Sequence, residues 1–339
     1  MPATLNSISS PLESPLPEAR IESDAGIIGE RLGSAGEDLV VPAREWTDAA
    51  ARGLIVIVAI VLAWYTWAHW GDFQVDCGRE LYVPAEILRG KLIYRDFFYS
   101  YGPLAPYLCA LLIAIFGPHL VVLYLFGIAV AIGCAIMLYE LGAMLEGRAA
   151  GLTAALALLF VGVAPNSSNY ILPYSYAATT GLLLSLICVW FTLRHIFDQN
   201  GYDLLKAGFA ASMAILCKQE LGAACYLMLA FVVVMEAILR RSIRPLLDGI
   251  IACAPGVMLW IAIYGWFFWT LTPTYMLDAN WIGMPGTPGQ PYAAHLYSLT
   301  GQRFIPREML ALTIGGAASL LVWFLLAKAR QGPRNVILE

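Results

Sequence analysis

Residues 54–70 read LIVIVAIVLAWYTWAHW. The run is apolar until it closes in a cluster of aromatic residues, and its length approaches the roughly 20 helical residues that cross a hydrocarbon core. Tryptophan and tyrosine gather where a membrane meets water. Trp64, Tyr65, Trp67 and Trp70 therefore mark an interface, and the stretch predicts a membrane-spanning helix.

Further apolar runs repeat this pattern along the chain. They lie at about 119–140, 149–164, 177–193, 204–217, 221–239, 246–271 and 309–327. The composition agrees, because 60% of the residues are hydrophobic and only 13% are charged, against roughly 25% charged in soluble domains. We therefore expect an all-α, polytopic transmembrane helical bundle with about eight spans.

The basic residues of the short loops decide how residues 103–117 are placed. This stretch is apolar but short, and Pro103 and Pro118 bound it. If it lies along the interface instead of spanning, the basic loops all fall on one face, as expected for cytoplasmic loops. Those basic residues are Arg148, Arg194, Lys206, Arg240, Arg241, Arg244, Lys328 and Arg330. We predict a multi-pass plasma (inner) membrane protein with both termini cytoplasmic.

The opposite, outer face then receives the loops that carry polar and aromatic residues. These are residues 71–118, about 165–176, 218–220 and 272–307. Ionisable residues in the middle of a span mark ion pathways, and here Glu140, Glu236 and Asp248 lie near the ends of their runs. The pattern favours an enzyme working at the membrane surface over an ion-coupled transporter.

The first outer loop holds the densest group of charges. Residues 79–89 predict an amphipathic helix lying in the interface, with apolar residues on one face and charged residues on the other. The apolar residues are Leu81, Ala85 and Leu88, and the charged ones are Glu80, Glu86 and Arg89. Asp76 and Arg79 are three residues apart and can meet on one helical turn. The alternative is a solvated loop with a weak ion pair.

Asp76, the segment RGKLIYRDFF at 89–98 and the segment YGPLAPY at 101–107 follow the first span in order. Their order and spacing resemble the GT-C glycosyltransferases, membrane enzymes that use polyprenyl-phosphate sugars. Protein-mannosyltransferase-like and lipid-A-sugar-transferase-like members are the nearest. The resemblance covers about residues 53–240, and it implies that 103–117 is a juxtamembrane helix.

The resemblance also implies roles for individual residues. Asp76 is the catalytic base for the acceptor hydroxyl, and Asp96 is a second catalytic acidic residue of the same loop. Arg79 and Lys218 bind the donor phosphate. One departure is that many members carry Asp-Glu where this chain has Asp76-Cys77. The resemblance implies neither an organic cofactor nor a metal site, with a divalent cation left open.

Four further residues are candidates for a sugar or acceptor pocket: Tyr174, Tyr176, Glu220 and His295. Each has a plainer interpretation. The alternative for residues 165–176 is an ordinary turn, and the alternative for Glu220 is a salt bridge with Lys218. Lys218 is also placed where a lysine snorkels from an apolar run, and aromatic residues of the last outer loop, around His295, fit an interface.

We therefore predict an inverting glycosyltransferase that moves a sugar from a polyprenyl-phosphate donor to a lipid, glycan or protein acceptor on the outer face. The alternatives are a transporter or flippase for a lipid-linked solute, and a non-catalytic protein that binds a lipid or a partner. We expect three parts: a disordered tail at 1–48, a catalytic membrane module at 53–240 and a variable region at 241–339. A net charge of −4 argues against a nucleic-acid partner.

Overall fold

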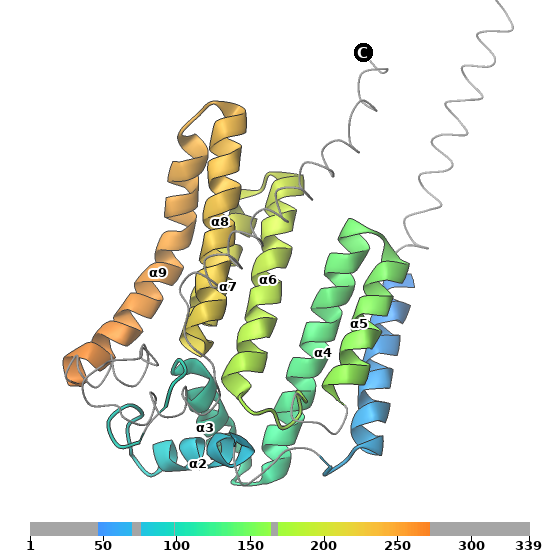
Figure 1. Cartoon of the computed structure of the whole chain (residues 1–339), viewed down its shortest axis with the longest axis vertical. Coiled ribbons are helices and arrows are strands. Elements are labelled where there is room, and N and C mark those ends of the chain that lie inside the picture. The colour runs from blue at the N-terminus through green and yellow to red at the C-terminus, as the bar shows by residue number, and fades with distance from the viewer. Residues whose placement is uncertain (1–46, 70–75, 98, 164–168, 272–339) are drawn as a thin grey trace, which may run out of the picture. The chain divides into compact units, whose positions relative to one another are not determined.

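The computed structural model describes residues 47–69, 76–97, 99–163 and 169–271, and of Asp76 the backbone alone (Figure 1). The chain divides into two units, Met1–Gly53 and Leu54–Glu339, and the contacts reported below belong to the second. Most of the predicted tail, the span at 309–327 and the outer loop at 272–307 lie outside the described residues.

The regular structure of the described residues is helical, which confirms the predicted all-α class; the segment Ile93–Phe97 adds only an isolated bridge. The first helix is Thr47–Tyr65. The others are α2 (Asp76–Leu88), α3 (Leu104–Phe116), α4 (Leu120–Leu145), α5 (Arg148–Gly162), α6 (Tyr176–Asp198), α7 (Gly201–Cys217), α8 (Gln219–Arg240) and α9 (Arg244–Thr270).

Five of these helices are long and apolar enough to cross a membrane: Thr47–Tyr65, α4, α6, α8 and α9. The predicted number of about eight spans is therefore not confirmed within the described part of the chain. Two of the missing spans fall on α5 and α7, which have only 15 and 17 residues. With 13 residues, α3 is only about 20 Å long, too short for a hydrocarbon core of about 30 Å.

The helix predicted at 79–89 exists as α2, but the two glutamates of its predicted charged face are buried. Glu80 and Glu86 are buried, whereas Leu88 is exposed and Leu81 is partly exposed. Each buried carboxylate has polar partners: Glu80 accepts a hydrogen bond from the Tyr176 amide, and Glu86 lies beside two cations. Glu86 forms ion pairs with Arg89 and Lys91, and the Lys91 ammonium lowers the pKa of Glu86.

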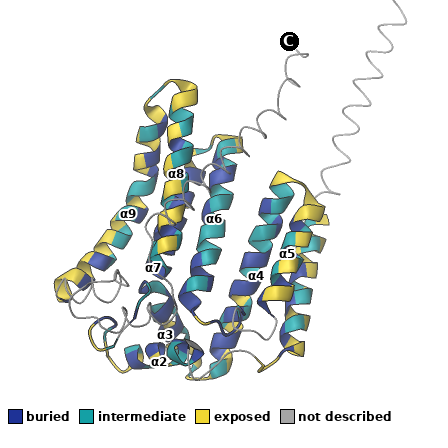
Figure 2. Ribbon diagram, in the orientation of Figure 1, coloured by how far each residue is buried: buried dark blue, intermediate teal, exposed yellow. Residues whose placement is uncertain are grey.

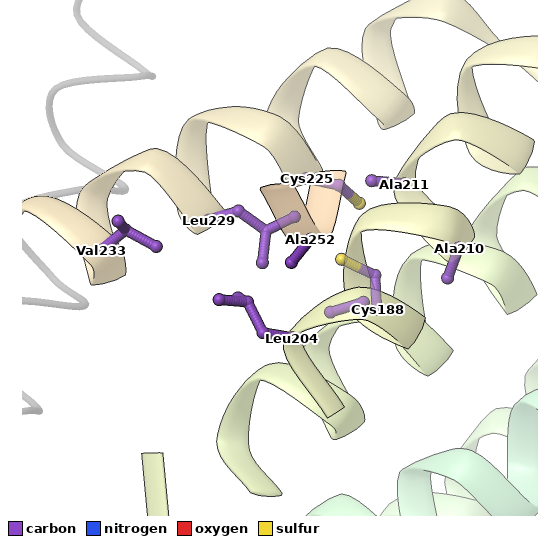
Figure 3. Packing of buried hydrophobic residues seen from close by; sticks show 9 residues of the cluster. Cys188, Leu204, Ala210, Ala211, Cys225, Leu229, Val233 and Ala252 are labelled. Carbon is purple, nitrogen blue, oxygen red and sulfur yellow. The ribbon is translucent and has the colours of Figure 1, made fainter. Parts of the chain in front are cut away.

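Small side chains let the membrane helices pack closely. A cluster from α6, α7, α8 and α9 is built mainly of alanine, cysteine and leucine, and Figure 3 shows the thiol groups of Cys188 and Cys225 facing each other inside it. Large apolar side chains lie outside instead, as the exposed positions along α8 and α9 in Figure 2 illustrate. Trp269, for example, is 91% exposed. This distribution suits a protein whose surroundings are lipid.

Glycine permits a close backbone contact between α4 and α5. A Cβ added at Gly151 would overlap the carbonyl oxygen of Tyr139, and one added at Gly142 would overlap the backbone of Gly151. The two helix backbones therefore touch, and no side chain larger than hydrogen fits at either position.

We expect Gly151→Ala to lower the free energy of unfolding by about 1–3 kcal/mol, because the added methyl group overpacks a backbone contact. Gly265→Ala is the matched control, since an added Cβ there meets nothing within 4 Å. The measurement is thermal unfolding in detergent. A thiol-reactive fluorophore detects unfolding, because it labels the buried cysteines once they become exposed. Equal unfolding midpoints for both variants would contradict the close packing.

Candidate functional site

Three side chains of α2 contact the backbone of residues 172–176, which lead into the first residue of α6. The contacts are Cys77 Sγ to the Leu172 carbonyl (3.3 Å), Arg79 Nη2 to the Tyr174 carbonyl (2.7 Å) and Glu80 Oε2 to the Tyr176 amide (2.9 Å). The partners on that segment alternate along the chain. The first outer loop and the segment at 169–175 therefore form one continuous structure at the end of the bundle where α6 begins (Figure 1).

The Arg79 guanidinium contacts a carboxylate and an aromatic ring. Its Nε atom donates to Glu80 Oε1 at 3.3 Å, and its guanidinium carbon lies 5.2 Å from the centre of the Tyr101 ring. A cation over an aromatic face is attracted by the ring quadrupole. The side chain remains 28% exposed, so the cation is held in place and is still accessible.

Lys218 reaches the same ring from the other half of the fold. It is the single residue between α7 and α8, with an extended backbone (φ −147°, ψ 116°). Its Nζ atom lies 5.6 Å from the centre of the Tyr101 ring. It also lies 3.5 Å from the hydroxyl oxygen of Tyr174, to which it donates. Arg79 and Lys218, far apart in the sequence, therefore meet at Tyr101.

Backbone contacts hold Tyr101 in this place. The amide of Gly102 donates to the Cys217 carbonyl at 2.9 Å, and a Cβ on Gly102 would overlap the Leu216 carbonyl oxygen. The hydroxyl of Tyr94 donates to the Tyr101 carbonyl at 2.7 Å. Glycine at 102 thus allows the loop to press against the end of α7, next to Lys218.

The described side chains that meet at the Tyr101 ring include two cations, Arg79 and Lys218. Arg79 is paired with the buried carboxylate of Glu80, whereas among the described residues no carboxylate forms an ion pair with Lys218. Burial raises the pKa of Tyr101, so its phenol stays neutral near pH 7 and adds no negative charge beside the two cations. An arrangement of this kind attracts an anion.

Asp76 is the first residue of α2, three residues before Arg79. Its backbone therefore lies one helical turn from the guanidinium-bearing residue. Its side chain lies outside the described part of the structure, as does His295.

Asp96 has its contacts within its own loop. Its carboxylate accepts from Arg95 Nε (2.9 Å), Arg95 Nη2 (2.8 Å) and the Leu92 amide (2.7 Å). The Arg95 guanidinium lowers the pKa of Asp96 to about 2. The structure does not bring this carboxylate to Arg79 or Lys218, and an acid of such low pKa accepts a proton poorly near pH 7.

The three remaining pocket candidates have different surroundings. Tyr174 is exposed and contacts both cations. Tyr176 is fully buried, and its hydroxyl hydrogen-bonds the carbonyls of Leu123 and Ile171 at 2.9 and 2.8 Å. Glu220 is exposed on the first turn of α8.

The sequence pattern predicted no role for Tyr101 and placed Glu80 on the charged face of the helix, opposite the apolar residues. Tyr101 stands in the segment YGPLAPY, but the pattern does not say that its ring faces two cations. Glu80 stands among other charged residues of an amphipathic helix, where a glutamate ordinarily faces water. The four-residue spacing from Asp76 to Glu80 was the available signal, because it places both on one side of a helix.

An apolar groove of about 280 Å³ lies beside the cations. It is lined by Pro103, Leu104, Tyr107, Leu216, Ile263, Trp266 and Phe267. Pro103 and Leu216 flank the hydrogen bond between Gly102 and Cys217, so the groove begins one residue away from the bond that holds Tyr101. A cationic site and an apolar groove therefore adjoin.

A helical membrane protein with such a site is fitted to an anion that carries an apolar chain. Residues 100–266 match the family model described as dolichyl-phosphate-mannose-protein mannosyltransferase. The match spans just under half of the 339 residues, and it includes Tyr101, Tyr174 and Lys218. It confirms the resemblance predicted from the motifs and supports a GT-C-like membrane glycosyltransferase. Comparisons with curated proteins and with solved structures give no match.

We expect Asp96→Asn to lower the thermal unfolding midpoint at pH 7, because the substitution removes the ion pair with Arg95. The folded-state pKa of Asp96 is about 2, below the ordinary value of about 3.9. The stabilisation is therefore present above about pH 4 and is lost as the pH falls toward 2.

Midpoints of wild type and variant, measured from pH 7 down to pH 2, should differ at neutral pH and converge in acid. Glu86 titrates in both proteins, so the difference between them isolates Asp96. A difference that stays constant down to pH 2 would show that the carboxylate charge contributes nothing.

Proposed function

We propose that the protein transfers a sugar from a polyprenyl-phosphate donor to a hydroxyl group of a lipid, glycan or protein acceptor on the non-cytoplasmic face of the inner membrane. The observation that carries the proposal is the convergence of Arg79 and Lys218 on the Tyr101 ring, beside an apolar groove. The family match supports the transfer of a glycosyl group.

The donor suits the site in two respects. Its phosphate is anionic and would bind between Arg79 and Lys218, where charge-assisted hydrogen bonds are strong. Its isoprenoid chain is apolar and would enter the groove between α3 and α9, which Leu104 and Phe267 line. Both halves of an amphiphilic donor are thereby accommodated by adjoining surfaces.

The proposed reaction is a single displacement at the anomeric carbon. The acceptor oxygen attacks the anomeric carbon, and its proton passes to the Asp76 carboxylate. The bond from the anomeric carbon to the phosphate oxygen breaks, and its electron pair leaves with the polyprenyl phosphate. Arg79 and Lys218 stabilise the charge that develops on that phosphate. Because the displacement takes one step, the anomeric configuration inverts, as in single-displacement glycosidases.

The remaining residues have supporting roles in this proposal. The ring of Tyr174 borders the site and offers a surface on which a sugar stacks, whereas Tyr176 supports that segment from behind and Asp96 braces the loop at 92–96. Glu220 and His295 are candidates for contact with the acceptor. No metal or organic cofactor is included, because Arg79 and Lys218 supply the positive charge.

We expect Asp76→Asn to abolish transfer while donor binding persists, because the amide cannot accept the acceptor's proton. Loss of a general base costs roughly 10²–10⁴-fold in rate. Lys218→Gln should instead weaken donor binding, because one cation is lost. Transfer of radiolabelled sugar and binding of the polyprenyl-phosphate donor, both with purified protein, separate the two effects.

Lys206→Gln is a control for Lys218→Gln, since Lys206 pairs with Asp203 elsewhere in the fold. Unchanged transfer by Asp76→Asn would remove Asp76 from the mechanism. Donor binding without transfer to any acceptor would favour a lipid-binding protein, and movement of the intact donor across the bilayer would favour a flippase.

We expect Ile263→Trp to raise the KM for a long-chain donor, because the larger side chain fills the groove that Ile263 lines. A short-chain, water-soluble donor analogue should be affected little. Ile261→Trp is the matched control, because Ile261 lies on the same helix and is 52% exposed, outside the groove. An equal effect on both donors would show that the chain binds elsewhere.

A further inference from the structure

Glu80 is a buried carboxylate at the centre of the site. Its side chain is only 4% exposed, and burying a charge is costly unless hydrogen bonds compensate for lost water. Each of its oxygens has a partner. Oε1 accepts from Arg79 Nε at 3.3 Å, and Oε2 accepts from the backbone amide of Tyr176 at 2.9 Å.

The Tyr176 contact fixes Glu80 to a rigid element. Tyr176 is the first residue of α6, a helix of 23 residues, and the amides of a first helical turn lack partners within the helix. A carboxylate placed there is stabilised by the amide and by the positive end of the helix dipole. Glu80 is thereby anchored to the N-terminus of α6, and its second oxygen is directed at Arg79.

Arg79 is consequently held by two hydrogen bonds, one to Glu80 of its own helix and one to the segment that precedes α6. Glu80 orients its Nε atom, and the carbonyl of Tyr174 accepts from Nη2 at 2.7 Å. Two contacts at different nitrogens fix the plane of the guanidinium group, because the group is rigid and flat. That plane places the cation at the Tyr101 ring, the ring that Lys218 also reaches.

We propose that Glu80 is a positioning residue that orients Arg79 toward the donor phosphate by linking it to the N-terminus of α6. The proposal rests on the proposed function, because it assigns the phosphate to Arg79. Glu80 touches neither donor nor acceptor in this arrangement and acts through Arg79.

The sign of the effect separates positioning from simple charge. If Glu80 mattered only as a negative charge near an anion site, a neutral replacement would tighten phosphate binding. If Glu80 orients Arg79, a neutral replacement weakens binding, because glutamine of the same shape that keeps its oxygen on the Tyr176 amide turns an NH₂ group toward the guanidinium.

The experiment measures binding of polyprenyl monophosphate, without a sugar, to purified protein in detergent, and then KM and kcat with the complete donor. We expect Glu80→Gln to raise the Kd roughly tenfold or more, as for a lost hydrogen bond to a charged group. KM should rise in parallel, with a smaller change in kcat. Glu86→Gln is the matched control, a buried glutamate of the same helix whose partners are Arg89 and Lys91, and should leave both constants within about twofold.

Glu80→Asp keeps the charge and shortens the reach by one methylene group, so it should also weaken binding. It serves as the second variant if Glu80→Gln does not fold, as judged by thermal unfolding. Binding by either folded variant that equals or exceeds that of wild type would overturn the positioning role. Absence of polyprenyl phosphate binding by wild type would overturn the proposed function, and with it this inference.

Discussion

Two cations from distant parts of the chain contact one tyrosine ring, and hydrogen bonds at this end of the bundle hold them there. Like charges repel, and each cation–ring contact contributes only about 0.5–2 kcal/mol. Hydrogen bonds to the backbone and to Glu80 supply the further stabilisation that keeps the two cations close together. The amide of Gly102 binds the end of α7, beside Lys218, while Glu80 and the Tyr174 carbonyl hold Arg79. The anion site is thus a product of helix ends, because these supply the amides and carbonyls.

Much of the fold was predictable because apolar length and loop charge are strong signals. The short helix α3 was expected to lie outside the set of spans, since residues 103–117 are bounded by prolines and break the pattern of basic loops. The orientation of α2 was not predictable. Periodicity shows that Glu80 and Leu81 differ in direction, but it does not say which side faces the protein when the outside is lipid. Glu80 turns inward because the first amide of α6 lies there.

The site was only partly predictable for a related reason. A family resemblance suggested Arg79 and Lys218, because each stands in a recognisable motif. Tyr101 and Glu80 act through contacts with residues distant in the sequence, such as Lys218 and Tyr176. A local pattern carries no information about such contacts. The expected pairing of Asp76 with Arg79 stays a prediction, and Asp96 pairs with its own neighbour instead.

Lys218 is also the whole connection between α7 and α8, one extended residue joining helices of 17 and 22 residues. Any change in the angle between those helices therefore turns about the residue whose ammonium group faces the site. Linkage is reciprocal, so under the proposed function binding of the donor phosphate to Lys218 would restrict the angle between α7 and α8, and restriction of that angle would favour binding. Bilayer thickness and lipid packing, which act on helix tilt, would then change the affinity of the site for the donor.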